Sequence, residues 1–321
     1  MKTAIAFLVF NRPELTERVF EEIRKARPPK LLVVADGPRA HFPGDIEQCV
    51  KVRAMIDRVD WDCEVYRNFS TTNMGCGMRV SSGLEWIFEQ VEEAIIVEDD
   101  CLPDQSFFLF CEELLERYRH DERVGFIGGV SFQRGKGSVP SSYYFSRGHY
   151  IWGWASWRRA WRGYDFKISM WPRLREEGWL NELFIDRGVV RYYTYSFDQT
   201  YKHVIDTWDF QWFLHCWVRN MWEIMPTVNL VTNIGHHETS ATHTTSRSKT
   251  QDVPVQPMGF PLIHPSRIAL DSLTDRENEA DRRFSYLTDL LIRRGKVLSR
   301  AKEKVLHLMA RTSKKMGHIS L

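Results

Sequence analysis

The sequence lacks several features that would place it in a simple class. None of its six cysteines lies in C-x-x-C spacing, so a zinc ribbon or a redox motif is not indicated. No segment approaches the roughly 20 consecutive apolar residues that a bilayer span needs. The short apolar start is followed by no small-x-small cleavage site, so a buried first strand explains it better than a signal peptide. We expect a cytoplasmic protein with free thiols.

Net charge is also scarce, at +2 over 321 residues, which gives no reason to expect a nucleic-acid partner. The charge is unevenly distributed. Residues 281–321 hold eleven Lys or Arg and three Asp or Glu, a local charge of +8, which leaves −6 on the other 280 residues. Apolar residues are interspersed among these charges. This pattern indicates a helix that either lies on an anionic membrane, at its inner face, or packs on the domain.

Strands and helices are predicted to alternate through the first 130 residues. Apolar, β-branched runs predict strands at residues 3–9, 30–36, 63–68, 94–97 and 124–129. Helical spacing of apolar residues predicts helices at 14–26, 46–59, 80–91 and 107–119. Strands separated by helices favour an α/β fold, with a mostly parallel central sheet flanked by helices.

Charged residues follow three of these predicted strands. Arg12 comes after the first strand, Asp36 ends the second, and the triplet Glu98-Asp99-Asp100 follows the fourth. In open α/β sheets the ligand site lies outside the carboxyl ends of the strands, so we expect these side chains to share one crevice.

The acidic triplet needs a physical explanation, because adjacent carboxylates resist ionising together. One interpretation is a solvated turn after the buried run at residues 94–97. The other is a site for a positive group. Mg²⁺ or Mn²⁺ prefers oxygen ligands and commonly binds one or two carboxylates together with substrate phosphates. Arg12 and Arg79 are then candidate contacts for a diphosphate.

The composition changes after residue 143, where tryptophan becomes abundant. Ten of the twelve tryptophans lie between residues 152 and 222. Such residues build cores, but their faces also stack on sugar rings, which makes Trp152 and Trp154 candidate acceptor-binding residues. A polar loop with three histidines follows, within NIGHHETSATH at residues 233–243.

The segment AIIVEDDCLPDQSFFLFCEELL resembles the metal-binding segment of GT-A glycosyltransferases, especially the N-acetylglucosaminyltransferase I-like family. The resemblance includes AFLVFNRPE, VVADGPR, the Gly-Trp pair of YIWGWASW and TWDFQW, and it spans residues 3–245. It implies the GT-A (Rossmann-like) nucleotide-diphospho-sugar transferase fold. The catalytic domain would occupy residues 1–270: a nucleotide-sugar-binding half (1–130), an acceptor-binding half (131–245) and a loop (246–270). A basic helical tail (271–321) would follow.

The resemblance also implies roles for residues of the donor site. Asp100 would bind the metal directly, and Glu98 and Asp99 would contact the ribose or the donor sugar. Asp36 would bind the base or ribose, and Arg12 a phosphate.

Two further roles follow from the resemblance. A histidine of the polar loop is expected to contact metal or phosphate, with His243 the first choice and His236 the second, or else to be an exposed loop residue. Asp209 would be the catalytic base, unless it caps a helix. Asp198 and Glu238 are the next candidates for the base.

These roles describe a metal-dependent, inverting hexosyl- or N-acetylhexosaminyltransferase. It would use Mn²⁺ or Mg²⁺ to move a sugar from a nucleotide-diphosphate donor, expected to be a UDP-sugar, to a hydroxyl of a glycan or glycolipid acceptor. One alternative is a non-catalytic sugar- or nucleotide-binding protein on the same scaffold. A sugar nucleotidyltransferase is less well supported, because the residues FNRPE after the first strand include no glycine.

Overall fold

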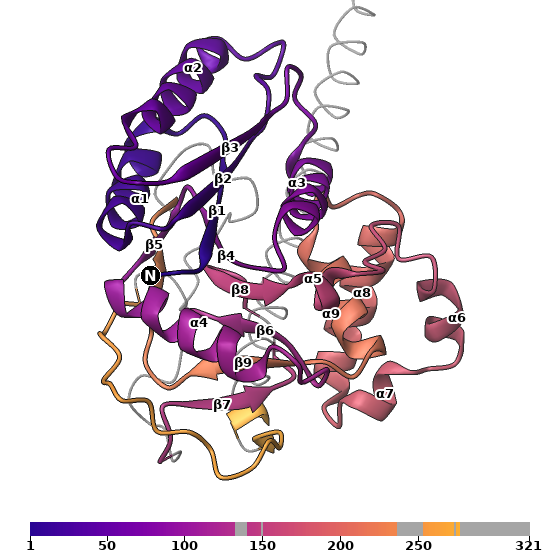
Figure 1. Ribbon diagram of the computed structural model, residues 1–321. Helices are drawn as coiled ribbons and strands as arrows, with labels where there is room; N and C mark the ends of the chain where they lie inside the picture. Colours follow the sequence, from indigo (N-terminus) through magenta and orange to yellow (C-terminus); the bar gives the residue numbers. More distant parts are fainter. Residues whose placement is uncertain (132–139, 149, 236–252, 273, 277–321) are drawn as a thin grey trace, which may run out of the picture.

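The computed structural model describes residues 1–131, 140–148, 150–235, 253–272 and 274–276 (Figure 1). Most of the predicted tail at residues 271–321 lies outside these ranges, as does the histidine loop from residue 236 onwards. Residues 253–269 contain no helix or strand. Among the described helices, none is both long and apolar enough to cross a membrane.

An eight-stranded sheet forms the centre of the fold, in the order β3-β2-β1-β4-β8-β6-β9-β7. Its strands are β1 (Ala4–Val9), β2 (Lys30–Ala35), β3 (Glu64–Phe69), β4 (Glu93–Glu98), β6 (Val124–Gly128), β7 (Tyr143–Ser146), β8 (Trp154–Trp157) and β9 (Trp222–Pro226). The first four pair in parallel, as do β6 and β9. Strand β8 runs antiparallel to β4 and β6, and β7 antiparallel to β9. The predicted α/β class is confirmed, and its sheet is mixed because the two strands β7 and β8 are inserted antiparallel.

The residues at the starts of two helices explain why these helices begin there. They are α1 (Pro13–Ala26), α2 (Asp45–Met55), α3 (Cys76–Gln90), α4 (Gln105–Tyr118), α5 (Arg158–Trp161), α6 (Trp171–Glu176), α7 (Leu180–Leu183), α8 (Arg187–Tyr201) and α9 (Asp209–Val218). Proline suits the first position of α1, where a backbone N–H has no partner within the helix. Asp104 caps α4 by accepting a hydrogen bond from the Ser106 amide at 2.9 Å.

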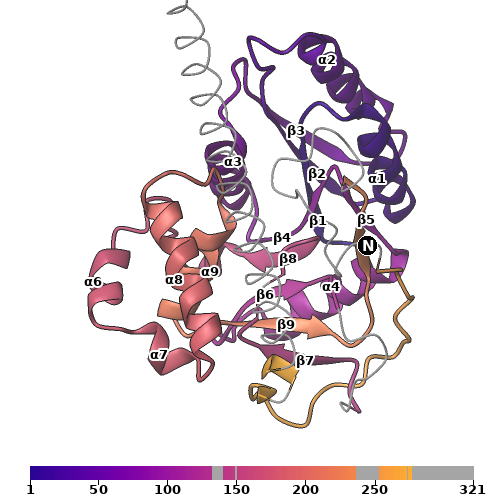
Figure 2. The same ribbon diagram turned by 180° about the vertical axis from the view of Figure 1, so that it is seen from behind.

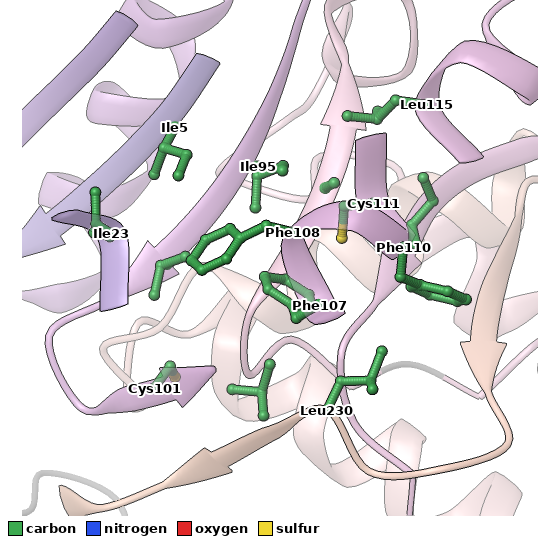
Figure 3. Close-up of a cluster of buried hydrophobic side chains, with 14 of the residues drawn as sticks. Ile5, Ile23, Ile95, Cys101, Phe107, Phe108, Phe110, Cys111, Leu115 and Leu230 are labelled. Carbon is green, nitrogen blue, oxygen red and sulfur yellow. The ribbon is translucent and has the colours of Figure 1, made fainter. Parts of the chain in front are cut away.

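Two hydrophobic cores lie on opposite faces of the sheet, because successive strand side chains alternate between faces. Ile5 and Phe7 of β1 face α1, α2 and α4, and Ala6 and Leu8 face α3 and the helices α5 to α9. Figures 1 and 2 show these two layers of helices from opposite sides. Figure 3 shows the first core, where Phe107 and its neighbours from α4 lie against Ile5 and Ile95 of the sheet.

The tryptophan-rich stretch builds most of the second core. Trp154 is 0% exposed and its ring stacks on that of Trp208, with centroids 5.6 Å apart at an angle of 22°. No face of Trp154 is exposed to a ligand in this structure, and its predicted contact with the acceptor remains untested. The bulk of this ring fills the space between β8 and α9. Trp152 is only partly buried, and its predicted role is untested.

Gly83 sets how closely α3 packs on the sheet. A Cβ at this position would lie 2.6 Å from Cγ1 of buried Val34, a stiff β-branched side chain in β2. We therefore expect Gly83→Ala to destabilise the protein by about 1–3 kcal/mol through overpacking. Helix propensity alone would predict stabilisation of about 1 kcal/mol.

Urea unfolding of Gly83→Ala checks this prediction. The double variant Gly83→Ala/Val34→Ala loses the 2.6 Å contact and keeps only one of 3.3 Å to Cβ of residue 34, so its loss of stability should be smaller than the sum of the two single losses. A stabilised Gly83→Ala variant would show that α3 does not pack against β2 at this distance.

Candidate active site

The carboxyl ends of β1 and β4 bring Arg12 to the acidic triplet. The two strands are parallel neighbours, with Leu8 of β1 opposite Glu98 of β4. Arg12 stands at the amino end of α1, just beyond β1. Its guanidinium forms ion pairs with Asp99 Oδ1 and with Asp100 Oδ2, the latter at 2.9 Å. The structure thus brings Arg12 and the triplet together at these strand ends, and the predicted contact of Arg12 with a phosphate is untested.

Arg12 does not neutralise the whole triplet. Burial acts to lower its pKa, but the charges of Asp99 and Asp100 outweigh burial and raise it. Burial likewise raises the pKa of Asp99, although Arg12 opposes this. Burial and the charges of Asp100 and Asp99 together raise the pKa of Glu98 to about 8. One guanidinium therefore offsets only part of the charge that a fully ionised triplet would carry, and a bound cation would favour the ionised forms.

A short ribbon carries a distant part of the chain to Asp100. Strand β5 (Cys101–Pro103) pairs antiparallel with β10 (Val231–Asn233). The Ile234 amide donates to the Asp100 carbonyl at 2.8 Å, and a Cβ at Gly235 would lie 2.6 Å from Asp100 Oδ2. The polar loop thus begins beside Asp100.

The structure does not test the predicted roles of the histidines in this loop. His236 and His243 both lie outside the described residues, so their predicted contact with metal or phosphate is untested. The same holds for Glu238, one of the two reserve candidates for the base.

Asp209 is the first residue of α9, a helix of the second core layer. Its Oδ1 atom accepts hydrogen bonds from the Thr207 hydroxyl and from the Phe210 amide, the latter at 2.8 Å. The Asp209 charge is close enough to contribute to the raised pKa of Glu98. The structure therefore places the predicted base near the triplet, although the two are far apart in the sequence.

Asp198 lies further along the same layer, in α8. Its carboxylate accepts hydrogen bonds from the Trp171 indole at 3.0 Å and from the Arg175 guanidinium at 3.2 Å. These contacts join α8 to α6, which is a structural task. Asp209 therefore remains the first candidate for the base.

Asp36 holds the loop that leads into α3. Its carboxylate accepts hydrogen bonds from the Met74 and Gly75 amides and from the Asn73 side chain, at 2.9–3.2 Å. Asp36 is buried, and its predicted contact with the base or ribose remains untested.

Arg79 has a similar task at the ends of β2 and β3. Its guanidinium donates to the Ala35 carbonyl at 3.2 Å and to the carbonyl and side chain of Asn68, at 2.6 and 2.8 Å. Arg79 is also buried, and its predicted contact with a diphosphate remains untested.

One residue of this region was not predicted from the sequence. Asp206 lies three residues before Asp209, and its carboxylate accepts hydrogen bonds from the Cys76 and Gly77 amides at the start of α3. The signal was present in the spacing of the two aspartates in DTWD, but only the fold shows which amides Asp206 reaches.

The carboxylates of the triplet supply some, but not all, of the ligands that a hard divalent cation needs. Asp100 and Glu98 supply carboxylate oxygens, the ligand type that Mg²⁺ and Mn²⁺ prefer. Within the described ranges, no three His, Cys, Asp or Glu side chains are grouped so as to hold a metal by themselves. A metal here would therefore need oxygens from a ligand such as a diphosphate, or a side chain from outside those ranges.

The raised pKa of Glu98 predicts a pH dependence of stability. Glu98 holds its proton more tightly in the folded protein, so its contribution to stability is complete below its ordinary pKa of 4.5 and is lost as the pH rises through about 8. Glu98→Gln removes this titration. The stability of the variant relative to wild type should increase between pH 5 and pH 8, by at most ~1.4 kcal/mol per pH unit.

Chemical unfolding at several pH values, without divalent cations, measures this effect. Glu89→Gln, at an exposed position of α3, is the control and should follow the wild type. A constant difference between Glu98→Gln and wild type across this range would contradict the raised pKa.

Comparisons with known proteins leave the family open. No protein-family model and no curated protein matches this chain. Among solved structures, it is similar to the mannosyltransferase PcManGT from Pyrobaculum calidifontis in complex with GDP-Man and Mn²⁺, with 16% identity and a TM-score of 0.34 over 50% of this chain and 46% of that one. It is also similar to S. aureus TarS 1-349, with 12% identity and a TM-score of 0.31 over 49% and 47% of the two chains. The chain thus spans about half the length of each structure.

Proposed function

We propose that this protein is a glycosyltransferase that moves a sugar from a nucleotide-diphosphate donor to a hydroxyl of an acceptor. The observation that carries the proposal is the placement of Asp209 near an incompletely neutralised acidic triplet at the carboxyl edge of the sheet. This pairing suits two separate tasks, binding a metal–diphosphate complex and accepting a proton. The resemblance of the surrounding sequence to GT-A enzymes supports the same assignment.

Asp100 would hold Mn²⁺ or Mg²⁺ in this proposal, with His243 or His236 as the candidate histidine ligand, and Glu98 and Asp99 would contact the ribose or the donor sugar. A bound divalent cation would neutralise charge on the diphosphate leaving group. The Asp100 side chain is 15% exposed, and its Oδ2 atom already pairs with Arg12. Arg12 would thereby fix the direction of the carboxylate, whose remaining lone pairs can still be presented to a cation.

Asp209 would act as the base that accepts the proton of the acceptor hydroxyl. Hydrogen bonds from the Thr207 hydroxyl and the Phe210 amide hold the orientation of its carboxylate. Attack from the face opposite the diphosphate would invert the anomeric centre, and one base then suffices. Because Asp209 also bonds to an amide of its own helix, a purely structural role is the alternative that the experiments below must separate.

A second candidate function is a non-catalytic protein that binds a sugar or nucleotide. The observation that favours it is the engagement of both Asp100 oxygens, Oδ2 by Arg12 and Oδ1 by the Cys101 thiol at 3.4 Å. Such a triplet is partly neutralised without any metal. Turnover separates the two candidates, since metal-dependent transfer or slow donor hydrolysis requires an enzyme.

A thermal-shift screen of nucleotide sugars, with and without Mn²⁺, tests the proposed function and identifies the donor. A ligand at about 100 times its dissociation constant adds about 2.7 kcal/mol of stability. We expect stabilisation by one nucleotide sugar that depends on Mn²⁺, followed by turnover of that compound. Absence of both would overturn the proposal, and binding without turnover would favour the second candidate.

Finer aspects of the function remain proposals from the sequence. They are a UDP-sugar donor, transfer of a hexose or N-acetylhexosamine, and a glycan or glycolipid acceptor. The basic tail would bring the enzyme to the inner face of an anionic membrane. Deletion of residues 296–321 should then weaken sedimentation with anionic vesicles and spare donor hydrolysis. Equal sedimentation of both proteins would contradict this role.

Asp100→Ala should abolish metal-dependent binding of the nucleotide. The substitution removes a carboxylate that the proposal assigns to the cation. Calorimetry with the nucleotide diphosphate, with and without Mn²⁺, measures the effect. Glu122→Ala removes an exposed carboxylate elsewhere and should bind as the wild type does. Unchanged affinity and metal dependence in Asp100→Ala would exclude it as a ligand.

Asp209→Asn should separate transfer from donor binding. The amide keeps the shape but cannot accept the proton, so transfer should fall by about 10²- to 10⁴-fold. Donor affinity with Mn²⁺ should stay near that of the wild type, because Asp209 is not assigned to the diphosphate. Both quantities are measured on the same preparation. Near-normal turnover would show that Asp209 is structural, and Asp198 and Glu238 would become the candidates for the base.

A further inference from the structure

We propose that Asp206 is a positioning residue, which holds the Asp209 carboxylate at the acidic edge of the sheet by binding the first amides of α3. The inference rests on the proposed function, because it assigns Asp206 a task in that reaction. Asp206 itself would touch neither donor nor acceptor.

The contact between Asp206 and α3 uses both carboxylate oxygens. Asp206 Oδ2 accepts a hydrogen bond from the Cys76 amide at 2.9 Å, and Oδ1 accepts one from the Gly77 amide at 2.8 Å. Both amides belong to the first turn of a 15-residue helix, where N–H groups have no partner within the helix and the helix dipole attracts an anion. Charge-assisted hydrogen bonds of this kind are stronger than neutral ones.

Two glycines allow the approach of the Asp206 segment. Gly75 has a φ of +81°, and a Cβ there would lie 2.6 Å from Asp206 Oδ2. A Cβ at Gly77 would lie 2.6 Å from the Thr207 carbonyl oxygen. A larger residue at Gly77 would push the backbone of the Thr207 segment away from α3, and one at Gly75 would displace the Asp206 carboxylate.

The start of α3 is itself held in place, because hydrogen bonds join it to the end of β2. Asp36, at the end of β2, accepts hydrogen bonds from the Met74 and Gly75 amides. Asp36 and Asp206 thus bind successive amides of one short segment. The segment connects the proposed donor side of the site to the proposed base.

Hydrogen bonds at Thr207 carry this restraint from Asp206 to Asp209. The Gln211 side chain donates to the Thr207 carbonyl at 2.6 Å, and the Thr207 hydroxyl donates to the Asp209 carboxylate. Thr207 and Gln211 are both buried, so this connection lies inside the protein.

Trp208, the residue between Thr207 and Asp209, is also held in place. Its ring stacks on that of buried Trp154, and its carbonyl accepts a hydrogen bond from the Tyr164 hydroxyl at 2.9 Å. Asp206 is thus joined to Asp209 by two residues that are themselves held in place, so a shift of Asp206 relative to α3 would be passed on to Asp209.

The start of α3 is also close to both acidic groups of the site. Burial raises the pKa of the Cys76 thiol, and the charges of Glu98, Asp209, Asp206 and Asp100 raise it further. One thiol is thus near the triplet and near the Asp206–Asp209 segment, as expected if this part of α3 sets their separation.

A purely structural cap is the competing explanation, and Asp186 provides a matched control. Asp186 caps α8, a helix of the same length, by accepting hydrogen bonds from the Gly188 and Val189 amides. Asp186→Ala and Asp206→Ala each remove a carboxylate from a helix start, so both should lower the melting temperature. Only Asp206→Ala should lower kcat, by about 10- to 100-fold, because a base displaced by ~1 Å loses activity on that scale. Donor affinity should change little.

The decisive measurement is a double-mutant cycle with Asp209→Asn. If Asp206 acts through Asp209, Asp206→Ala should reduce kcat in the wild-type background and have almost no further effect in Asp209→Asn. Equal reductions in both backgrounds, or a kcat for Asp206→Ala equal to that of Asp186→Ala, would overturn the inference while leaving the proposed function intact. A wild-type protein without transfer or hydrolysis would overturn both.

Discussion

The ion pairs of Arg12 with Asp99 and Asp100 are the interaction on which the candidate site depends. They join the end of β1 to the end of β4 at a point where three carboxylates would otherwise repel one another. One guanidinium balances only part of this charge, and burial together with the charges of Asp100 and Asp99 raises the pKa of Glu98. The proposed function assigns a divalent cation to this edge of the sheet, where it would favour the ionised carboxylates.

Charged side chains elsewhere in the site act as connectors. Asp36 and Arg79 are buried and bind backbone groups of the loops after β2 and β3, and each meets several hydrogen-bonding partners, as low-dielectric surroundings require. Asp206 is exposed and binds the first amides of α3. A ligand would enter a framework whose loops are already held in place.

Much of the fold was predictable, because the first half of the chain has clear periodicity. The buried runs became β1, β2 and β4, and Arg12 met the triplet because parallel strands end at the same edge. The direction of β8 was not predictable, since pairing depends on distant residues rather than local pattern. Nor could spacing show that Trp154 is buried or that Asp206 binds α3. Both facts depend on tertiary packing between elements far apart in the sequence.

Strand β8 lies between β4 and β6 and is the only strand that joins the two parallel parts of the described sheet. During synthesis, β4 is complete at residue 98, but its second edge cannot be covered until residues 154–157 leave the ribosome. Non-local pairing of this kind slows folding, and an uncovered apolar edge invites association with other chains. The nascent chain therefore passes through a stage in which one edge of β4, the strand that ends at Glu98, is still unpaired.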